Sequence, residues 1–461
     1  MARNFQYRQA ATADLLQDAG ERATRYLEEI RERAVALPAE AIEQLSALGG
    51  RFPEIEADPA KVIRLLDEIG SPATMATAGP RYFGFVIGGA LPVTVAANWL
   101  AGAWDQVPGA SLVSPVGVAC ERIAIEWLVE IFGLPQGTWG GLVTGATEGN
   151  FTGLAAARQA ILARQGWDAA AKGIFGAPKI RVVVGEEIHV SALLALRVLG
   201  FGREDLIRVP VDKQGRMRAD ALPELDANTI VCTQAGNVNS GAFDPLEAIC
   251  RQARAAGAWV HVDGAFGLWA AADPERNHLV EGVSIADSWS TDAHKWLNVP
   301  YDCGIVLCRE PKYLVEVMSL DPAGYIDATR GSAEPHNFTL QMSRRARGLE
   351  VWAALRVLGR SGLADLIGRT CEYARTFAEK LSAAGFEILN DVVLNQVLVS
   401  FGDDEKTQRV IAGVQEEGTM WAGGTKWHGV QAIRISVSSW ATTAEDVDRS
   451  IDAIIRVANE A

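Results

Sequence analysis

The ten residues from Ala258 to Gly267, AWVHVDGAFG, decide how the chain folds. A short apolar and β-branched run ends in the acidic Asp263, and small residues follow it, which is typical of a buried strand that enters a tight loop. Similar short runs alternate with amphipathic helical segments from about residue 115 to 310. In chain order these segments are ERIAIEWLVEIFG, IRVVVGEE, SALLALRVLGF, TIVCTQAG, EAICRQARAAG and CGIVLCRE. The alternation predicts an α/β domain built around a largely parallel sheet.

The regions on either side of this domain have different patterns. Residues 11–69 space their apolar positions three and four apart, as in LLQDAGERATRYLEEIRERAV, which indicates a helical N-terminal arm. After about residue 320, long helical segments precede the strand-like stretches FEILN, NQVLVSF and AIRISVSSW. We therefore expect a helical arm over residues 1–70, a large α/β domain over 71–320 and a smaller α+β domain over 321–461.

The composition excludes several classes of protein. The chain has 461 residues, of which 49% are hydrophobic and 22% charged, as in an ordinary globular protein. A net charge of −14 without long single-sign blocks argues against nucleic-acid or anionic-membrane partners. The six cysteines form no CxxC pair, so neither a metal site nor a disulfide scaffold is predicted. The lack of a signal pattern and of any apolar run of about 18 residues predicts a cytoplasmic protein without a membrane span.

Two loops that follow apolar runs each present a charged side chain. Ligands of open α/β sheets bind beyond the carboxyl ends of the strands, so these loops are where a site is expected. Lys295 stands between a histidine and a tryptophan in the stretch 288–304, SWSTDAHKWLNVPYDCG, where the plain alternative is a solvated lysine at a strand end. Asp263 ends an apolar strand, and its plain alternative is a carboxylate that pairs with a helix N-terminus or an arginine.

Two further loops lead into helical stretches. In GGLVTGATEGNFTGL, the small residues Gly145, Ala146 and Thr147 precede the helix and allow backbone N–H groups to approach an anion, although a plain tight turn has the same pattern. In EEIHVSALLALRVLG, His189 stands where a strand gives way to a helix, and a histidine there can equally serve as a structural cap.

One ligand employs all four loops, namely pyridoxal 5′-phosphate (PLP), a flat phosphorylated heteroaromatic aldehyde. Lysine can hold the aldehyde as an imine, and an aspartate facing the pyridine nitrogen keeps that nitrogen protonated. A histidine can stack on one face of the ring, while a small residue such as Ala265 lets the other face pack closely. The small-residue loop at 145–147 is then free to take the phosphate.

The motifs TGATEGN, HVDGA and DAHKW, with His189 between the first two, resemble those of the group II PLP-dependent amino-acid decarboxylases, the relatives of aromatic-L-amino-acid decarboxylase. The resemblance covers most of the chain, including GPRYFGFVIGGALPVT and SRRARGLEVWAALRVLGRSGL. It implies the type I fold of aspartate aminotransferase, with a large PLP-binding domain, a helical arm and a small C-terminal domain. It also implies decarboxylation of an L-amino acid to an amine and CO2, through a Schiff base on Lys295 and a quinonoid intermediate.

The resemblance assigns an expected role to each matching residue. Lys295 would carry the cofactor, His189 would stack on its ring, and Asp263 would pair with its pyridinium. The other expected cofactor contacts are Gly145, Ala146, Thr147, Asn237, Ala265 and His294.

The chain departs from the family pattern at two points. In LDPAGYID, Tyr325 is the expected general acid, but two residues separate it from Pro322 where the family often has one. Asp292 stands where the aromatic enzymes often carry an asparagine. A carboxylate near a phosphate must either turn away or form a hydrogen bond with His294.

The substrate pocket is expected around GPRYFGFVI, with Phe85, Val86 and Ile87 as an apolar wall and Gln106 as a polar contact. Gly109 falls where the aromatic enzymes carry a phenylalanine, which implies a larger or differently shaped pocket. We predict an aromatic L-amino acid as the substrate. Because this fold usually completes its active site with residues of a second subunit, we also predict a homodimer with the arm on its partner.

Two alternatives remain open at this point. An aldehyde synthase, aldolase or aminotransferase of the same fold would keep the cofactor and change the reaction, and a tyrosine at 325 favours simple protonation instead. A PLP-binding or PLP-free scaffold without turnover would have no use for Lys295, Asp263 and His189 together.

Overall fold

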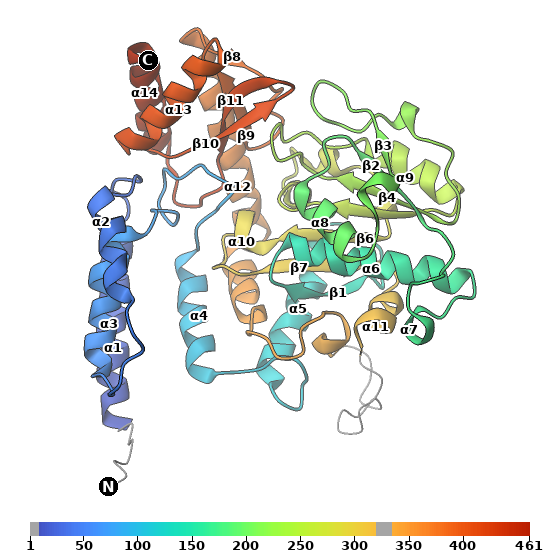
Figure 1. Cartoon of the computed structure of the whole chain (residues 1–461), viewed down its shortest axis with the longest axis horizontal. Helices are drawn as coiled ribbons and strands as arrows, with labels where there is room; N and C mark the ends of the chain where they lie inside the picture. Colours follow the sequence, from blue (N-terminus) through green and yellow to red (C-terminus); the bar gives the residue numbers. More distant parts are fainter. Residues whose placement is uncertain (1–8, 320–333) are drawn as a thin grey trace.

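A seven-stranded sheet forms the centre of the computed structural model, which describes residues 9–319 and 334–461 (Figure 1). Its strands are β1 (Trp139–Val143), β2 (Arg181–Gly185), β3 (Leu206–Val209), β4 (Thr229–Gln234), β5 (Trp259–Asp263), β6 (Ser288–Asp292) and β7 (Gly304–Cys308). They lie in the order β1-β7-β6-β5-β4-β2-β3. Strands β2 to β6 are parallel, and β7 runs antiparallel to both of its neighbours. The predicted α/β fold with a largely parallel sheet is confirmed.

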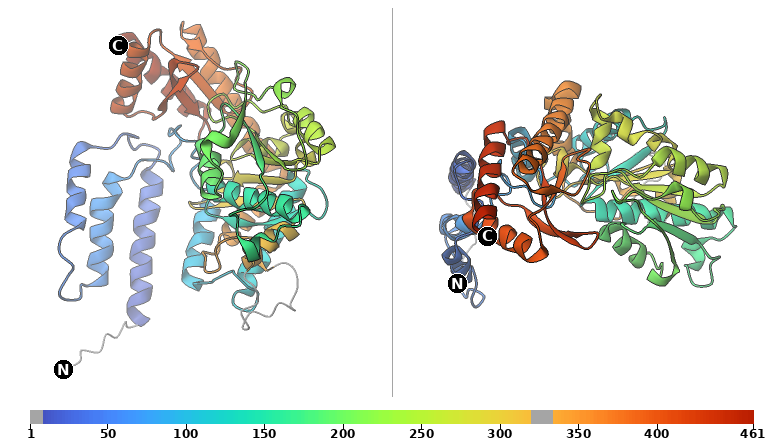
Figure 2. Two further views of the ribbon diagram at one scale, coloured as in Figure 1. Left: turned by 45° about the vertical axis from the view of Figure 1, so that its right-hand side comes forward. Right: turned by 90° about the horizontal axis from the view of Figure 1, so that it is seen from above.

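Helices cover both faces of this sheet (Figure 2), because its strands are apolar on both sides. The helices of one face are α6 (Ala146–Arg164), α8 (Val190–Val198) and α11 (Lys312–Met318), and those of the other are α5 (Pro115–Ile131), α9 (Leu246–Ala255) and the first half of α12 (Gly348–Ala383). Strand β2 shows the alternation that this requires. Val182 and Val184 belong to the core under α6 and α8, and Val183 belongs to the core that includes α5 and α9.

A second, antiparallel sheet follows in the order β10-β11-β9-β8. Its strands are β8 (Glu387–Ile388), β9 (Gln396–Ser400), β10 (Gly423–Trp427) and β11 (Val430–Ser436). The helices α13 (Asp404–Glu417) and α14 (Ala444–Glu460) belong to the same small domain. The long helix α12 joins the two parts, since Leu363 and Ile367 belong to the large core and Phe377 and Leu381 to the small one. The domain boundary expected at residues 320 and 321 stays a prediction.

The N-terminal arm is a layer of helices beside the main body (Figures 1 and 2). It contains α1 (Gln9–Glu29), α2 (Ala39–Gln44) and α3 (Pro59–Leu65), and α4 (Pro92–Trp104) follows the loop that leads back to the main body. Across the described ranges, no helix combines the length and the apolar composition that crossing a membrane requires.

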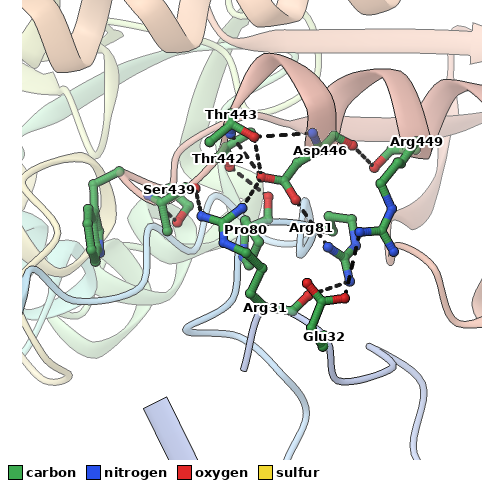
Figure 3. Close-up of polar contacts among 12 residues, drawn as sticks. Arg31, Glu32, Pro80, Arg81, Ser439, Thr442, Thr443, Asp446 and Arg449 are labelled. Carbon is green, nitrogen blue, oxygen red and sulfur yellow. Dashed lines mark hydrogen bonds and ion pairs between the residues drawn. The ribbon is translucent and has the colours of Figure 1, made fainter. Parts of the chain in front are cut away.

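A buried carboxylate fastens the arm to the C-terminal helix (Figure 3). Arg31 donates a hydrogen bond of 2.6 Å to Oδ2 of Asp446, and Arg81 donates one of 3.1 Å to Oδ1. Asp446 also closes a capping box with Thr443 at the start of α14. Burial acts to raise the pKa of Asp446, but the hydrogen bonds from Thr443 and Arg31 outweigh it and lower that pKa.

Candidate active site

The site is centred on the lysine that follows β6. Lys295 lies on α10 (Ala293–Trp296), and its Nζ is 2.9 Å from Oδ2 of Asp292. The lysine side chain is 19% exposed and the aspartate side chain 3% exposed. The amine is therefore paired and mostly buried, unlike the solvated surface lysine that the sequence left open.

The carboxylate of Asp292 turns toward helix α6. Its Oδ1 accepts a hydrogen bond of 2.6 Å from the backbone N–H of Ala146, at the positive end of that helix. The same oxygen is 3.5 Å from Nε2 of His294. Asp292 thus links the lysine to the helix N-terminus where the sequence predicts a phosphate, and it makes no hydrogen bond with His294.

Space and hydrogen-bond donors surround this helix N-terminus. A Cβ at Gly145 would lie 3.2 Å from Cε1 of His294 and 3.5 Å from Oδ1 of Asp292, so glycine keeps the gap between them open. His294 accepts the N–H of Cys303 at Nδ1, at 2.9 Å. Burial lowers the pKa of His294, so the ring is neutral and carries its proton on Nε2, facing the gap. Backbone amides, an imidazole N–H and an amine form a donor set that fits a phosphate, and in this structure the carboxylate of Asp292 accepts from the Ala146 amide and pairs with the amine.

Asp263 ends strand β5 and is 6% exposed. Its Oδ2 accepts a hydrogen bond of 2.8 Å from Nδ2 of Asn150, and its Oδ1 accepts one of 3.2 Å from the N–H of Ala265. The carbonyl of Ala265 in turn accepts the N–H of Asp292 at 2.9 Å, so this small residue ties the ends of β5 and β6 together. The carboxylate held in this way fits the role of a partner for a pyridinium nitrogen.

His189 is the N-cap of α8, as its structural alternative predicts. Nδ1 accepts the N–H of Ser191 at 3.2 Å and lies 2.7 Å from its Oγ. Burial lowers the pKa of His189, and the charges of Asp263 and Lys295 act on the same ring. His189 therefore both caps α8 and lies close to Asp263 and Lys295. A cavity of about 720 Å³ opens beside His189 and Thr147.

Asn237 lies in the loop after β4 and is 2% exposed. Its Oδ1 accepts the N–H groups of Asn239 and Ser240, at 2.9 and 3.3 Å. The side-chain oxygen thus shapes its own loop, and the cofactor contact expected for Asn237 stays a prediction.

The expected substrate loop is held in an unusual conformation. Phe85 and Val86 have positive φ angles of 52° and 60°, which non-glycine residues seldom adopt. Phe85 is 60% exposed, whereas Val86 is 1% exposed and belongs to the large core together with residues of the sheet. Ile87 is half-buried against the base of the arm. Phe85 is therefore the member of the predicted trio whose side chain is exposed.

An aromatic stack supports this loop from the small domain. The ring of Trp421 lies 5.0 Å from that of Tyr82 and 5.5 Å from that of Phe85. A Cβ at Gly84 would meet the Trp421 ring at 2.1 Å, so only glycine fits there. At the other end of the loop, a Cβ at Gly88 would lie 2.0 Å from the carbonyl of Lys295. Loop, small domain and lysine are thus in direct contact.

The structure leaves two of the remaining sequence predictions, Gln106 and Tyr325, as predictions. Gln106 follows α4, and its amide donates to the carbonyl of Trp104 at 2.9 Å. Within the described part of the chain, no hydrogen bond or ion pair joins Gln106 to Lys295, Asp263 or His189. Tyr325, the expected general acid, lies outside the described residues.

Sequence reasoning missed Asn150, Ser191 and Trp421, each of which contacts a predicted site residue. The structure buries Asn150 completely, at 0% exposed. A polar amide directly after Gly149 and three residues before Gly153 was the available signal.

The chain is similar in sequence to known proteins of one family. The pyridoxal-dependent decarboxylase conserved domain matches residues 50–402. An aromatic-L-amino-acid decarboxylase of Bacillus atrophaeus is 29% identical over 67% of this chain and 64% of its own length. A phenylacetaldehyde synthase of Petunia hybrida is 25% identical over 86% of this chain and 84% of its own.

Among solved structures, Oryza sativa TDC with PLP and tryptamine is similar in fold. It superposes with a TM-score of 0.91 at 23% identity and covers 99% of both chains. The fold is therefore that of the type I PLP enzymes. The chain belongs to the pyridoxal-dependent decarboxylase family and is a PLP-dependent enzyme.

Proposed function

We propose that this enzyme decarboxylates an L-amino acid with an aromatic side chain, releasing the amine and CO2. The observation that carries the proposal is the convergence of Lys295, Asp263 and His189 at the carboxyl ends of the sheet strands, beside the N-terminus of α6 where Gly145 leaves space. The family match and the aromatic decarboxylases among the relatives support the reaction and the substrate class.

The chain's own groups divide the work of holding PLP. Lys295 would hold the aldehyde carbon, and Asp263 would accept the N–H of the pyridine ring. The backbone of residues 145–147 and Nε2 of His294 would donate to the phosphate, which the positive end of α6 would also attract. Ala265 and His189 would contact the ring, and Asn237 would be a further contact of the cofactor.

When bound, PLP supplies an electron-accepting ring that takes up the electron pair left by a broken bond at Cα of the amino acid. The protein chooses which bond breaks by fixing the orientation of the substrate, which is the task of the loop at 84–88 and of His189. Tyr325 would donate the proton that Cα then requires. Lys295 would hold the cofactor in the resting enzyme.

An aromatic substrate suits the wall that the chain offers. Phe85 is exposed and rests on Trp421, so its ring is presented on a stiff support. A ring on such a support packs well against an aromatic side chain, and offset or edge contacts add about 0.5–1.5 kcal/mol to area burial.

The working form is proposed to be a homodimer. Helix α4 exposes Trp99, Leu100 and Trp104 at 49%, 52% and 46%, and the arm exposes Phe52 at 95%. Apolar side chains of this size on neighbouring elements are typical of a protein interface. Light scattering during size-exclusion chromatography tests this, and a fully active monomer would contradict it.

Product analysis tests the reaction. The holoenzyme is incubated with a panel of L-amino acids, and amine, CO2, aldehyde, ammonia and peroxide are measured together. We expect amine and CO2 in equal amounts from an aromatic member of the panel. Aldehyde with ammonia and peroxide would instead assign the reaction of the phenylacetaldehyde synthase relative, which is the second candidate because that similarity spans most of both chains.

The role of Tyr325 has its own test. Tyr325→Phe removes the hydroxyl and keeps the ring, so we expect cofactor binding to persist while amine formation falls by about 100-fold or diverts to aldehyde. The measurement is the ratio of amine to aldehyde per CO2 released. Amine formation at the rate of the unmodified enzyme would exclude Tyr325 as the proton donor.

A further inference from the structure

A continuous chain of hydrogen bonds leads from Trp259 to Asp263. Nε1 of Trp259 donates to Oγ of Ser288 at 3.0 Å, and this hydroxyl lies 2.8 Å from Nδ1 of His261. Nε2 of His261 lies 2.9 Å from Oδ1 of Asn150, whose Nδ2 donates to Asp263 at 2.8 Å. Each of these five side chains is at most 6% exposed.

The direction of every bond in this chain is fixed by chemistry. Burial lowers the pKa of His261 to about 3, so the imidazole is neutral and has one donor and one acceptor nitrogen. The indole N–H of Trp259 can only donate, so Oγ of Ser288 accepts from it and gives its own proton to Nδ1 of His261. Nε2 of His261 then carries the ring proton and donates to Asn150. Ser290 also donates its hydroxyl to Oδ1 of Asn150.

The orientation of the Asn150 amide follows, because two donors hold its oxygen. Its Nδ2 must face away from them, and it has two N–H groups to give. One is donated to Asp263, and the other reaches Oγ of Ser191 at 3.3 Å. The Ser191 hydroxyl is then free to donate to Nδ1 of His189 at 2.7 Å. One amide therefore contacts Asp263 directly and His189 through one hydroxyl.

The packing of α6 is arranged around this amide. A Cβ at Gly149 would lie 2.9 Å from Cβ of Ser290, and one at Gly153 would lie 2.7 Å from Cε1 of His261. Any side chain at either position would push the helix away from β5 and β6. The glycines before and after Asn150 thus let the helix approach the sheet closely enough for the amide to reach both of its neighbours.

We propose that Asn150 is the positioning residue of this site, which holds Asp263 as a hydrogen-bond acceptor and His189 as a ring with an accepting Nδ1, while His261 sets the orientation of its amide. The inference rests on the proposed function in one respect, namely that Asp263 and His189 face the cofactor. The new element is that Asp263 and His189, which would both contact the cofactor ring, are coupled through Asn150. Loss of the Asn150 amide disturbs both, and loss of Ser191 disturbs His189 alone.

Asn150→Asp tests this, because it keeps the size of the side chain and replaces the donor that faces Asp263 with an acceptor. Two adjacent carboxylates share a proton, so Asp263 no longer offers a full negative charge. We expect PLP to bind about 10- to 100-fold more weakly, and the pH at which the bound cofactor changes its visible absorbance to shift. Both are measured on the resting enzyme without amino acid, so neither depends on which substrate or reaction is correct.

Asn390→Asp is the matched control. Asn390 is a buried asparagine of the small domain, 7% exposed, whose amide donates to the carbonyls of Ser240 and Gln396. We expect its PLP dissociation constant and pH profile to stay within about twofold of the unmodified protein. Equal changes in Asn150→Asp and Asn390→Asp would reduce the effect to general destabilisation and overturn the proposal.

Ser191→Ala keeps the test decisive if Asn150→Asp fails to fold by circular dichroism. Ser191 is half-buried and its removal strands no charge, so we expect about fivefold weaker PLP binding and a shifted pH profile. Unchanged binding and an unchanged profile in Ser191→Ala would overturn the link to His189. If the unmodified protein gave no visible band with PLP, the site assignment of the proposed function would fail first and this inference with it.

Discussion

Asp446 and Asp292 are equally buried, at 2% exposed, yet the first joins two parts of the fold and the second lies in the proposed active site. Asp446, at the junction of arm and small domain, is held by Arg31 and Arg81. Asp292, at the end of β6, is held by Lys295. A guanidinium stays charged at any physiological pH and forms no imine, whereas an amine can lose its proton and attack a carbonyl. Burial alone therefore does not mark a functional carboxylate, and the chemistry of its partner does.

The largest expected effect on activity comes from removing Lys295, the reactive partner of Asp292. Lys295→Ala leaves no amine to hold the aldehyde, so we expect both the visible band of bound PLP and all measurable turnover to be lost. Lys312→Ala is the control, since Lys312 is an exposed lysine 2.7 Å from Glu310 and far from the site in the fold. Turnover by Lys295→Ala within about tenfold of the unmodified enzyme would remove the amine from the mechanism.

At the arm junction the expected loss is in stability. Arg81→Met leaves the carboxylate of Asp446 without its fully buried partner, so we expect the free energy of unfolding in urea to fall by about 3–5 kcal/mol. The side chain of Arg31 is 45% exposed, and Arg31→Met is expected to cost about 1 kcal/mol or less. Equal free energies of unfolding for the two variants would contradict the role of burial at this junction. A large rise in the PLP dissociation constant of Arg81→Met would contradict the separation of the junction from the active site.

A smaller effect is expected at Asp292. Asp292→Asn removes a negative charge beside the proposed phosphate site and keeps the shape of the side chain. We expect PLP to bind about 3- to 10-fold more tightly, as measured by absorbance titration. Weaker binding would mean that the charge of Asp292 supports the cofactor, and the phosphate would then have to lie elsewhere.

The smallest effect concerns pH and stability. The pKa of Asp446 is lowered in the folded chain, so its contribution is complete above the unfolded value of about 4 and is lost as the pH falls below it. The free energy of unfolding should therefore decline on acidification, and the decline should be shallower in Asp446→Asn. An identical decline in both proteins would show that other carboxylates account for it.

The parts of the site that sequence reasoning found are those that one loop reveals by itself. Asp263 and Lys295 each follow a recognisable strand, and small residues mark the helix N-terminus at 145–147. Asn150 and Trp421 were not predicted from the sequence, because their importance depends on which distant elements pack together. The amide of Asn150 reaches β5 only through the close approach of α6, and Trp421 meets the substrate loop only where the small domain joins the large one. The periodic spacing of apolar residues predicts which side chains are buried, and it does not predict which distant elements they contact.

The most direct test of the account is reductive trapping of bound PLP in the unmodified protein. The holoenzyme is treated with borohydride and digested, and the phosphopyridoxyl label is located by mass spectrometry. The account predicts a single labelled lysine, Lys295, and loss of that label when Asp263→Ala weakens cofactor binding. A label spread over exposed lysines, or concentrated on another residue, would contradict the assignment of the site to the end of β6.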